Sequence, residues 1–503
     1  MKIENNFSDV LTEKSLLHPN KVYCYKINGR KITFLELEHY VNKCCRFFEE
    51  TGVGFGEVVN ISIPNSISFI VLYFAGLRSG IKVNPCPSTL SENELIKNIN
   101  FVESKLLITQ KLIDADNIPG NCSYLKFFDD DDFLLQLESY RDDKYEQEIC
   151  SDHIACIYYS SGTTDDPKCV LYSHKNMFSL TKSIVNEFQF LSESIHLGVL
   201  PLGHTAITNY QLLPSLYAGS TLFLAENFNS VRGDIWNIIA DLNITYLQVV
   251  PTILFSIMAT PYDEKDVGSN QSLKYIGCGS APLSIESQIN FHKRFDVKVA
   301  NLYGLSETGP SHYDNPLLPD WKPGSIGYPL TVNECKIFNK DLDEAKDGEI
   351  GQIGLKGDNV FVGYYKNKKA YKKAFFNDYF LTGDLGYKDV TGKYYFVDRE
   401  KDLIIKAGVN IAPGEIEEII FKLKNVQSAA VIGVPHEYFG EEIIAFVEKK
   451  DSSLKESHVV DILAENLQPL KRPDRIIFID NMPVGPSGKI LKRKLRKELN
   501  FYE

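Results

Sequence analysis

The spacing of apolar residues predicts alternating helices and strands in the first part of the chain. Residues 33–50 carry apolar side chains at helical spacing, residues 58–63 resemble a buried strand, and residues 68–80 form an apolar helix that ends in glycine. This alternation is typical of α/β layering, in which helices cover a sheet. The acidic run FDDDDF at 128–133 lacks the glycine and glutamate spacing of a calcium-binding loop, so we expect a solvated loop there.

The alternation continues through the middle of the chain. Between 153 and 224, apolar strands are interrupted by a loop rich in glycine and hydroxyl residues and by a helix. Between 245 and 303, each apolar segment precedes a turn, as expected for parallel strands that deliver their loops to one edge of a sheet. That edge is the natural place for a ligand. After Gly348, short segments punctuated by glycine predict a smaller, β-rich part.

A charged segment, DREKD at 398–402, follows the last of these short strands and indicates a boundary. Beyond it, the pattern predicts a helix, two strands and a final lysine-rich helix, which together would form a compact unit of about a hundred residues. We therefore predict an α/β protein with a large N-terminal domain at 1–398, built from two α/β subdomains and a β-rich subdomain. A boundary near residue 400 would separate it from a small α+β C-terminal domain at 404–503.

The composition and the net charge of the chain indicate which classes of binding partner are unfavourable. With 44% hydrophobic and 24% charged residues, the 503-residue chain has the composition of a globular protein. Its 54 Lys and Arg against 66 Asp and Glu give a formal charge of −12, which opposes general binding to nucleic acid or anionic lipid. The first residues lack the features of a signal peptide, and the apolar run at 69–77 is too short to span a membrane. We expect a cytoplasmic protein that acts on small molecules, with no nucleic-acid partner and no membrane span.

The loop YSSGTTDDPK at 159–168 is the first candidate for a phosphate site. It follows an apolar strand and combines a glycine, which permits close backbone approach, with four hydroxyl donors and a lysine. Composition alone leaves an ordinary Ser/Thr turn as the alternative.

Familiar signatures of other enzymes are incomplete in this chain. GPSGK at 485–489 lacks the full Walker A spacing, and GCG at 277–279 lacks the third glycine of a dinucleotide fingerprint. GLSET at 304–308 has threonine where the nucleophile elbow of a hydrolase needs glycine. The ten cysteines form no CxxC pair and no zinc spacing, so we expect reduced thiols rather than a metal site or a nucleophile.

An ordered set of motifs nevertheless resembles the adenylate-forming superfamily, which contains acyl- and aryl-CoA ligases such as 4-coumarate-CoA ligase, stand-alone adenylation enzymes and beetle luciferases. Beside the 159–168 loop, the motifs are PLGH at 201–204, GSAP at 279–282, NLYGLSET at 301–308, TGD at 382–384, REKD at 399–402 and PSGK at 486–489. Any one of them could arise by chance, but the ordered set is specific and the resemblance covers nearly the whole chain.

The resemblance implies an AMP-forming acid–thiol ligase. A carboxylate would attack the α-phosphate of ATP to give an acyl-adenylate and pyrophosphate, and the thiol of CoA or of phosphopantetheine would then take the acyl group. Because the nucleophile and the phosphate are both anionic, positive charge and oriented donors must stabilise the transition state. Mg²⁺ and lysine are the expected sources of that charge.

The resemblance also assigns the nucleotide site residue by residue. Tyr303 would stack on adenine, Ser306 would lie beside the α-phosphate, and Glu307 would hold Mg²⁺ through carboxylate oxygen. Asp384 and Arg399 would bind the ribose, since an ionised carboxylate accepts hydrogen bonds from both hydroxyls. The other expected contacts are Ser160, Ser161, Gly162, Thr163, Thr164 and Lys168 around the β- and γ-phosphates, and Ala281, Pro282 and Asn301 around the adenine.

Four further residues receive roles in catalysis and domain movement. Lys489 would bridge the incoming carboxylate and the α-phosphate, and His204 would lie at the mouth of the acid pocket. The resemblance also implies that the C-terminal domain is mobile and rotates about Lys401 in a hinge at 399–403. Gly408 would then approach the pantetheine tunnel.

Each assignment has a plainer alternative. Without the resemblance, Tyr303 would be a core aromatic residue, Asp384 a turn residue, and Lys489 part of a solvated basic helix. The ordered motifs favour function for these three residues. His204 stays open between a functional and a structural role.

Two positions depart from the family pattern. Asp165 and Cys169 stand where glycine is usual, so we expect a stiffer phosphate loop with an additional carboxylate near anionic phosphates.

Alternatives to a CoA ligase also remain open. The acyl group could pass to a separate carrier protein, the chain could be a nucleotide-binding relic without activity, and oxygenation of the luciferase kind has no distinguishing motif. The acid pocket is expected between residues 204–210, 245–253 and 278–284. The first segment has no Asp, which amino-acid-activating relatives often place there, so an acyl or aryl acid is favoured.

Overall fold

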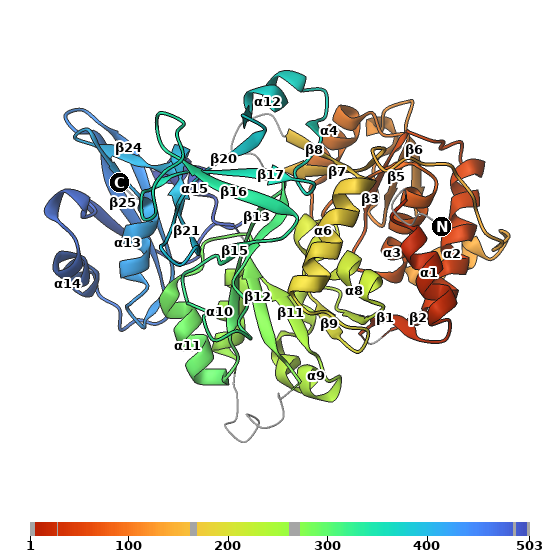
Figure 1. The fold of residues 1–503 in the computed structure, drawn as a ribbon, viewed down its shortest axis with the longest axis horizontal. Coiled ribbons are helices and arrows are strands. Elements are labelled where there is room, and N and C mark those ends of the chain that lie inside the picture. The colour runs from red at the N-terminus through yellow and green to blue at the C-terminus, as the bar shows by residue number, and fades with distance from the viewer. Residues whose placement is uncertain (1–5, 28, 161–167, 261–271, 486–488, 500–503) are drawn as a thin grey trace.

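The structure is a computed structural model that describes residues 6–27, 29–160, 168–260, 272–485 and 489–499. Four β-sheets organise the described residues, three of them before residue 400 and the fourth after it (Figure 1). Helices flank the two largest sheets, whose central strands are parallel, and the C-terminal part is a small α+β unit. The predicted α/β class is therefore confirmed.

The first sheet has a parallel centre with an antiparallel hairpin at one side. Strands β7 and β8 form this hairpin, and the short β18 pairs with β8 from far along the chain. The described strands run in the order β18 (Gly363–Tyr364), β8 (Lys168–Ser173), β7 (Ile154–Ser160), β4 (Lys82–Pro85), β3 (Val58–Ser62), β5 (Leu106–Thr109) and β6 (Ser123–Lys126).

The second sheet is parallel from β13 to β1 and closes with antiparallel strands at both ends. Its described strands run in the order β15 (Tyr328–Pro329), β14 (Gly309–Tyr313), β13 (Val299–Leu305), β12 (Tyr275–Gly279), β11 (Tyr246–Val249), β9 (Ile195–Gly198), β10 (Thr221–Leu224), β1 (Val22–Lys26) and β2 (Lys31–Thr33). The segments predicted to end in turns at one edge are β11, β12 and β13.

The other two sheets lie on either side of residue 400. The third is antiparallel and contains β16 (Asn333–Phe338), β17 (Gly351–Gly357), β20 (Tyr379–Lys388), β19 (Phe375–Phe376) and β21 (Tyr394–Arg399). The fourth contains β23 (Val409–Ile411), β22 (Ile404–Lys406), β25 (Gly440–Lys449), β24 (Val426–His436) and β26 (Arg475–Ile479). A single turn of 3₁₀ helix, Glu400–Asp402, connects the two sheets.

Most helices of the N-terminal part flank the first two sheets, whereas α12 (Lys368–Lys373) lies beside β18 and β19 (Figure 1). The helices of this part are α1 (Asp9–Leu17), α2 (Phe34–Glu50), α3 (Ile67–Arg78), α4 (Glu92–Val102), α5 (Asp130–Leu137), α6 (His174–Glu187), α7 (Thr205–Ile207), a π-helical turn (Thr208–Leu212), α8 (Leu213–Ala218), α9 (Ile235–Asp241), α10 (Pro251–Ala259), α11 (Ile285–Phe295) and α12. The C-terminal helices are α13 (Pro413–Ile420), α14 (Glu456–Asn466) and α15 (Lys492–Glu498). No helix among the described residues is both long and apolar enough to cross a bilayer.

The acidic run at 128–133 is not the solvated loop that its composition predicts. Asp129 caps α5 by accepting the N–H of Asp132, and Asp130 is only 5% exposed. The Asp130 carboxylate accepts N–H bonds from Ile67 at 3.2 Å and Ser68 at 2.8 Å, the first residues of α3. Its charge is placed where a helix start leaves N–H groups unpaired.

The buried side chain of Asn65 is one link between the first two sheets. The Asn65 amide donates to the backbone oxygens of Leu200 at 2.8 Å and Ala225 at 3.0 Å, and accepts the N–H of Leu202 at 2.7 Å. These contacts lie beyond the carboxyl ends of β3, β9 and β10. Both sheets therefore present their loops to a common region, which is where a ligand of an open α/β sheet binds.

The C-terminal unit has its own apolar cores. One packs α13 and α14 on one face of the fourth sheet, and the other packs α15 on the opposite face. Neither shares buried residues with the large core of the N-terminal part. An element with a separate core can change position as a body without disturbing the packing of its neighbour.

Candidate active site

Glu307 lies in a tight turn between β13 and β14, at the carboxyl edge of the second sheet. The turn is tight because a Cβ on Gly304 would lie 2.2 Å from the backbone oxygen of Gly309, a residue that has φ +59°. Thr308 Oγ1 accepts the N–H of Leu305 at 3.2 Å and closes the turn. The carboxylate of Glu307 is thereby carried by a rigid backbone at the expected site.

Two tyrosines that the sequence did not indicate support this turn. Tyr364 donates its hydroxyl to Glu307 Oε1 at 2.8 Å, and Tyr172 donates to the backbone oxygen of Ser306 at 3.0 Å. The ammonium of Lys168 lies 5.0 Å from the centroid of the Tyr364 ring, a cation–π distance. Tyr364 thus touches both the residue expected to hold Mg²⁺ and the lysine of the phosphate loop.

Tyr303, Asp384 and Arg399 form a second cluster at the same edge. Tyr303 donates its hydroxyl to Asp384 Oδ2 at 2.8 Å, and Arg399 Nε lies 3.4 Å from Asp384 Oδ1. Asp384 and Arg399 are register partners on β20 and β21, which explains their proximity. Tyr303 is 8% exposed and belongs to the core, so its plainer interpretation holds in part, but its hydroxyl points to the residue expected to bind ribose.

Asp384 is a buried carboxylate, 4% exposed, within β20, where it follows Gly383 with φ +73°; the alternative of a turn residue is wrong. Burial raises its pKa, while Arg399, the hydrogen bond from Tyr303, Lys489 and Lys401 act in the opposite direction. A buried ionised carboxylate gains from additional donors, since each lone pair without a partner costs free energy. Two sugar hydroxyls would supply such donors.

Lys489 reaches the same place from the other end of the chain. The pKa of its ammonium is lowered to about 8, chiefly by burial and also by Arg399 and Lys401, whereas Asp384 and Glu307 oppose the shift. These charges belong to β20, β21, the 3₁₀ turn, the β13–β14 turn and the segment before α15. Lys489 is not part of a solvated helix, because it is half-buried and precedes α15, and its charge interacts with those of Asp384, Glu307 and Arg399.

His204 combines a structural contact with a place near the site. Its Nδ1 accepts the N–H of Ala206 at 3.1 Å and caps α7, so Nε2 carries the proton of the neutral ring. Burial lowers the pKa of His204 to about 4, and Lys489 acts in the same direction. Gly203 packs so closely on the first sheet that a Cβ there would meet the Cys86 oxygen at 2.4 Å.

The predicted adenine contacts follow the ends of β12 and β13. Ala281 and Pro282 come directly after β12 and are partly or fully exposed. Asn301 pairs with Cys278 across β12 and β13 and lies two residues before Tyr303, on the same face of its strand. The three residues therefore stand at the edge that carries Tyr303.

Part of the predicted phosphate site lies outside the described residues, namely Ser161, Gly162, Thr163 and Thr164, together with Asp165. Its two ends are described, since Ser160 closes β7 and pairs with Lys168 at the start of β8. Cys169 is fully buried between apolar side chains of the first sheet, so it packs the strand and lies outside the loop that it was expected to stiffen.

The last two predicted residues lie in the connection to the C-terminal unit and beyond it. Lys401 is in the 3₁₀ turn Glu400–Asp402, and burial lowers the pKa of its side chain, with Arg399 acting in the same direction. Gly408 stands at the exposed tip of the β22–β23 hairpin with φ +78°. The charge of Lys401 interacts with those of Arg399 and Asp384, whereas no contact among the described residues brings Gly408 to the candidate site.

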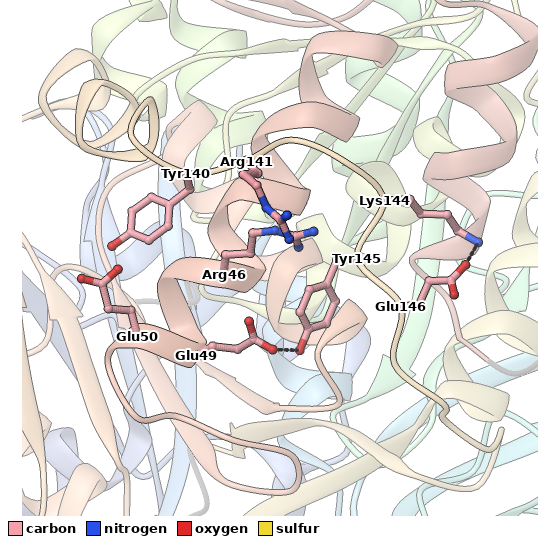
Figure 2. Close-up of a pocket in the computed structure, with 8 residues that line it drawn as sticks. All are labelled: Arg46, Glu49, Glu50, Tyr140, Arg141, Lys144, Tyr145 and Glu146. Carbon is pink, nitrogen blue, oxygen red and sulfur yellow. Dashed lines mark hydrogen bonds and ion pairs between the residues drawn. The ribbon is translucent and has the colours of Figure 1, made fainter.

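A surface pocket elsewhere on the molecule is not part of this site. It lies between α2 and residues 140–146, and Figure 2 shows its charged side chains directed largely toward one another. Glu49 accepts the Tyr145 hydroxyl at 3.0 Å and Lys144 pairs with Glu146 at 2.7 Å. None of the predicted site residues lines it.

No three His, Cys, Asp or Glu side chains gather as a preformed metal site in the part of the chain that the structure describes. Glu307 would therefore hold a cation together with ligands that come from elsewhere. Mg²⁺ is commonly bound in this way, by one or two carboxylates and the phosphates of its substrate. The donor set fits a metal that arrives with ATP.

Comparison with known proteins gives a consistent picture. A family model described as AMP-binding enzyme matches residues 11–365, and one described as AMP-binding enzyme C-terminal domain matches residues 415–489. The chain is 30% identical to sulfoacetate–CoA ligase of Cupriavidus necator, over 95% of this chain and 94% of that protein.

Solved structures agree over the full length. ATP-bound MatB from Rhodopseudomonas palustris superposes with a TM-score of 0.90 at 27% identity, covering 99% of this chain and 100% of that one. The apo form of the same protein, with the same identity and coverage, gives 0.79. ATP, Mg²⁺ and CoA are the cofactors of this family. With both of its domains matched by family models, the chain belongs to the AMP-binding enzymes, in the acyl- and aryl-CoA ligase branch of the adenylate-forming superfamily.

Proposed function

We propose that this protein uses ATP to activate a carboxylic acid that carries no second charged group. It would release pyrophosphate and transfer the acyl group to the thiol of CoA. The observation that carries the proposal is the convergence of Lys489, Asp384, Arg399 and Glu307, whose charges interact although they come from both parts of the chain. Two cations can stabilise the charge of two anionic reactants, and the two carboxylates can bind Mg²⁺ and the ribose.

Lys489 and Glu307 would have different roles in the first half-reaction. A carboxylate oxygen forms a bond to the α-phosphorus, and the bond from that phosphorus to the bridging oxygen breaks as pyrophosphate leaves. Lys489 would hold both anions and offset their repulsion, which replaces a diffusional encounter by an oriented one. Glu307, oriented by Tyr364, would hold Mg²⁺, which neutralises phosphate charge when bound.

Nucleotide binding would rest on the second cluster. The Tyr303 ring would stack on the adenine, and its hydroxyl donates a hydrogen bond to Asp384. The base and the ribose would therefore be bound by two residues that contact each other. Asp384 would accept from the ribose hydroxyls, and Arg399 would keep it ionised. Lys168 and Ser160, at the two ends of the phosphate loop, would bind the phosphates that leave.

The acid pocket is proposed between residues 204–210, 245–253 and 278–284, and these segments contain no Asp, Glu, Lys or Arg. A second acidic group on the substrate would find no partner there, and burying an unpaired charge is costly. Space is also limited beside β12, because a Cβ on Gly277 would meet Tyr246 Oη at 2.4 Å and Gln248 Oε1 at 2.5 Å. The first observation favours an acyl or aryl acid without a second charged group, and the second favours a short one.

An acid panel tests the proposal. We expect AMP release that requires both acid and CoA with short aliphatic and single-ring aromatic monocarboxylates, and at least about tenfold lower kcat/KM with sulfoacetate or malonate, since an unpaired buried charge costs more than 1.4 kcal/mol. A preference for the doubly acidic substrates would contradict the pocket assignment. Absence of acid-dependent pyrophosphate exchange with every acid would identify a nucleotide-binding relic.

The acceptor is tested separately, because the first half-reaction is the same for CoA and for carrier proteins. With the best acid of the panel, we expect mass spectrometry to show acyl-CoA. A thioester formed with a holo carrier protein and not with CoA would assign the chain to the loading enzymes instead. Oxygen uptake without a thioester product would point to oxygenation.

The connection at 399–403 is proposed to be a hinge between a domain at 1–398 and a lid at 404–503 that carries Lys489. Lys401→Pro is expected to lower thioester formation by about tenfold or more and to leave pyrophosphate exchange within about twofold, because proline fixes φ and blocks a backbone rotation. Lys401→Ala is the matched control, since it removes the same charge beside Asp384 but leaves φ free. Equal loss of both half-reactions in the proline variant would argue against a hinge here.

A further inference from the structure

Helix α13 of the C-terminal part lies beside α10 and α11 of the N-terminal part (Figure 1). Glu418, near the end of α13, accepts the N–H of Ile285 at 2.9 Å, and the backbone N–H of Glu286 also favours its charged form. Ile285 is the first residue of α11. A carboxylate from one part of the molecule therefore caps a helix of the other.

The start of α11 is incomplete without this carboxylate. The first N–H groups of any helix have no partner within it. The cap residue Ser284 satisfies the N–H of Ser287 through Oγ at 3.1 Å, and Glu418 satisfies the N–H of Ile285. The positive end of the helix dipole adds to the attraction of a carboxylate.

The beginning of α13 shows the reverse arrangement. Asp398, in the last strand before the 3₁₀ turn, accepts the N–H of Gly414 at 2.8 Å through Oδ2. Gly414 is the second residue of α13. Each part of the molecule thus supplies a carboxylate to the first turn of a helix in the other.

An aromatic contact extends the same face of α13. Phe421, three residues after Glu418, lies with its ring centroid 6.2 Å from that of Phe255 on α10. Helices α10 and α11 follow β11 and β12 at the edge that carries the candidate site, and α11 begins three residues after Pro282. The contact surface of α13 is therefore built on the segments expected to surround adenine and acid.

We propose that Glu418, with Asp398 and Phe421, forms a latch that holds the C-terminal domain in the position where Lys489 reaches the active site. The inference rests on the proposed function. Glu418 is a positioning residue, since it touches no reacting group and acts through Lys489. The latch must open before Lys489 leaves, because a rotation about residues 399–403 carries α13 away from α11.

The latch predicts an effect on one half-reaction only. Glu418→Ala is expected to lower kcat for acid-dependent pyrophosphate exchange about tenfold, the value of one charge-assisted hydrogen bond, with little change in KM for the acid. Thioester formation from added acyl-adenylate should stay equal or rise, since that step uses the open position. Glu418→Gln keeps the volume and one acceptor oxygen and should give a smaller loss in the same half-reaction.

A matched control comes from the same helix. Glu415 pairs with Lys471 at 2.7 Å inside the C-terminal part, so Glu415→Gln removes a charge from α13 without touching α11 and should leave both half-reactions unchanged. The pH profile supplies a readout that a loss of stability would not move. With the latch open, Lys489 is less buried, and the fall of exchange activity at alkaline pH should move above its wild-type position near 8.

The outcomes separate the latch from the proposed function. Wild-type protein without acid-dependent exchange would overturn the function itself. Wild-type exchange together with an unchanged rate and pH profile in Glu418→Ala would overturn the latch alone. An equal fall of both half-reactions in Glu418→Ala and Glu418→Gln would also overturn it, because a positioning role predicts that thioester formation survives.

Discussion

Replacing Lys489 by alanine is expected to lower acyl-adenylate formation by about 10³-fold, the scale on which a single preorganised charge in a water-poor site stabilises a transition state. The charge of the Lys489 ammonium interacts with those of Asp384, Glu307 and Arg399, and the cations Arg399 and Lys401 disfavour its protonated form. No neighbour can therefore take its place without a rearrangement. Thioester formation from added acyl-adenylate should stay within about twofold, because the lysine is needed only before pyrophosphate leaves.

The measurement is a comparison of two half-reactions on the same preparation. Acid-dependent exchange of labelled pyrophosphate into ATP reports the first, and release of AMP from synthetic acyl-adenylate plus CoA reports the second. Retention of exchange within about tenfold of wild type would remove Lys489 from its role, since an effect that small corresponds to a peripheral contact. Loss of both half-reactions would indicate damage to the fold.

The pH dependence gives this prediction a second test. Because burial lowers the pKa of Lys489 to about 8, the side chain is charged below that pH and loses its charge as the pH rises through it. Adenylation should therefore decline above about pH 8, while Lys489→Arg, which stays charged, should keep its lower activity to higher pH. The sign for stability is opposite: the lowered pKa destabilises the folded state below about pH 8, and the cost fades as the pH rises toward 10.5.

Local patterns predicted much of this architecture. Helix α2 occupies almost the expected range because Thr33 and Glu36 form a capping box and its apolar stripe has helical spacing, all within one segment. The sheet edge at which the candidate site lies was predictable for a similar reason. The apolar segments that form β11, β12 and β13 are each followed in the sequence by residues typical of turns. Features encoded within about four residues of one another are visible without a structure.

Features that depend on distant partners were not predictable in this way. Asp130 looked like a solvated acid, because the N–H groups it caps at Ile67 and Ser68 lie 63 and 62 residues away. Tyr364 gives no signal as a partner of Glu307, which is 57 residues away, since an aromatic residue in a short strand is usually part of the core. Its position beside Glu307 follows only from the pairing of β18 with β8.

The same reasoning explains why the candidate site was predictable as a set and its geometry was not. The ordered motifs named Tyr303, Asp384 and Arg399 separately. Their contacts come from the register of β20 with β21 and from the packing of the third sheet against the second, which no single motif contains. The hydroxyl that Tyr303 donates to Asp384 links the residue proposed to bind adenine with the residue proposed to bind ribose.

Removal of the Asp384 carboxylate is expected to raise KM for ATP by about 100-fold, since two hydrogen bonds to an ionised acceptor each contribute about 1.5 kcal/mol or more. Asp384→Asn retains one acceptor oxygen and should give an intermediate rise. The acid pocket is made by other segments, so KM for the acid should change by less than about threefold, as expected for separate sites. Nucleotide affinity measured by calorimetry should fall in parallel with KM.

Deoxynucleotides turn this prediction into a double-mutant cycle in which the second change is made on the substrate. Wild-type enzyme should discriminate against 2′-deoxy-ATP and 3′-deoxy-ATP, whereas Asp384→Ala should use ATP and both analogues about equally, because the acceptor that distinguishes them is gone. Tyr303→Phe is the matched control: it keeps the ring, removes the hydroxyl that donates to Asp384 at 2.8 Å, and should preserve the discrimination. If Asp384→Ala still rejected the deoxy analogues as strongly as wild type, the ribose would have to be bound by other residues. A carboxylate acts on a vicinal diol through geometry as well as charge, and only the paired loss of affinity and discrimination identifies that contact.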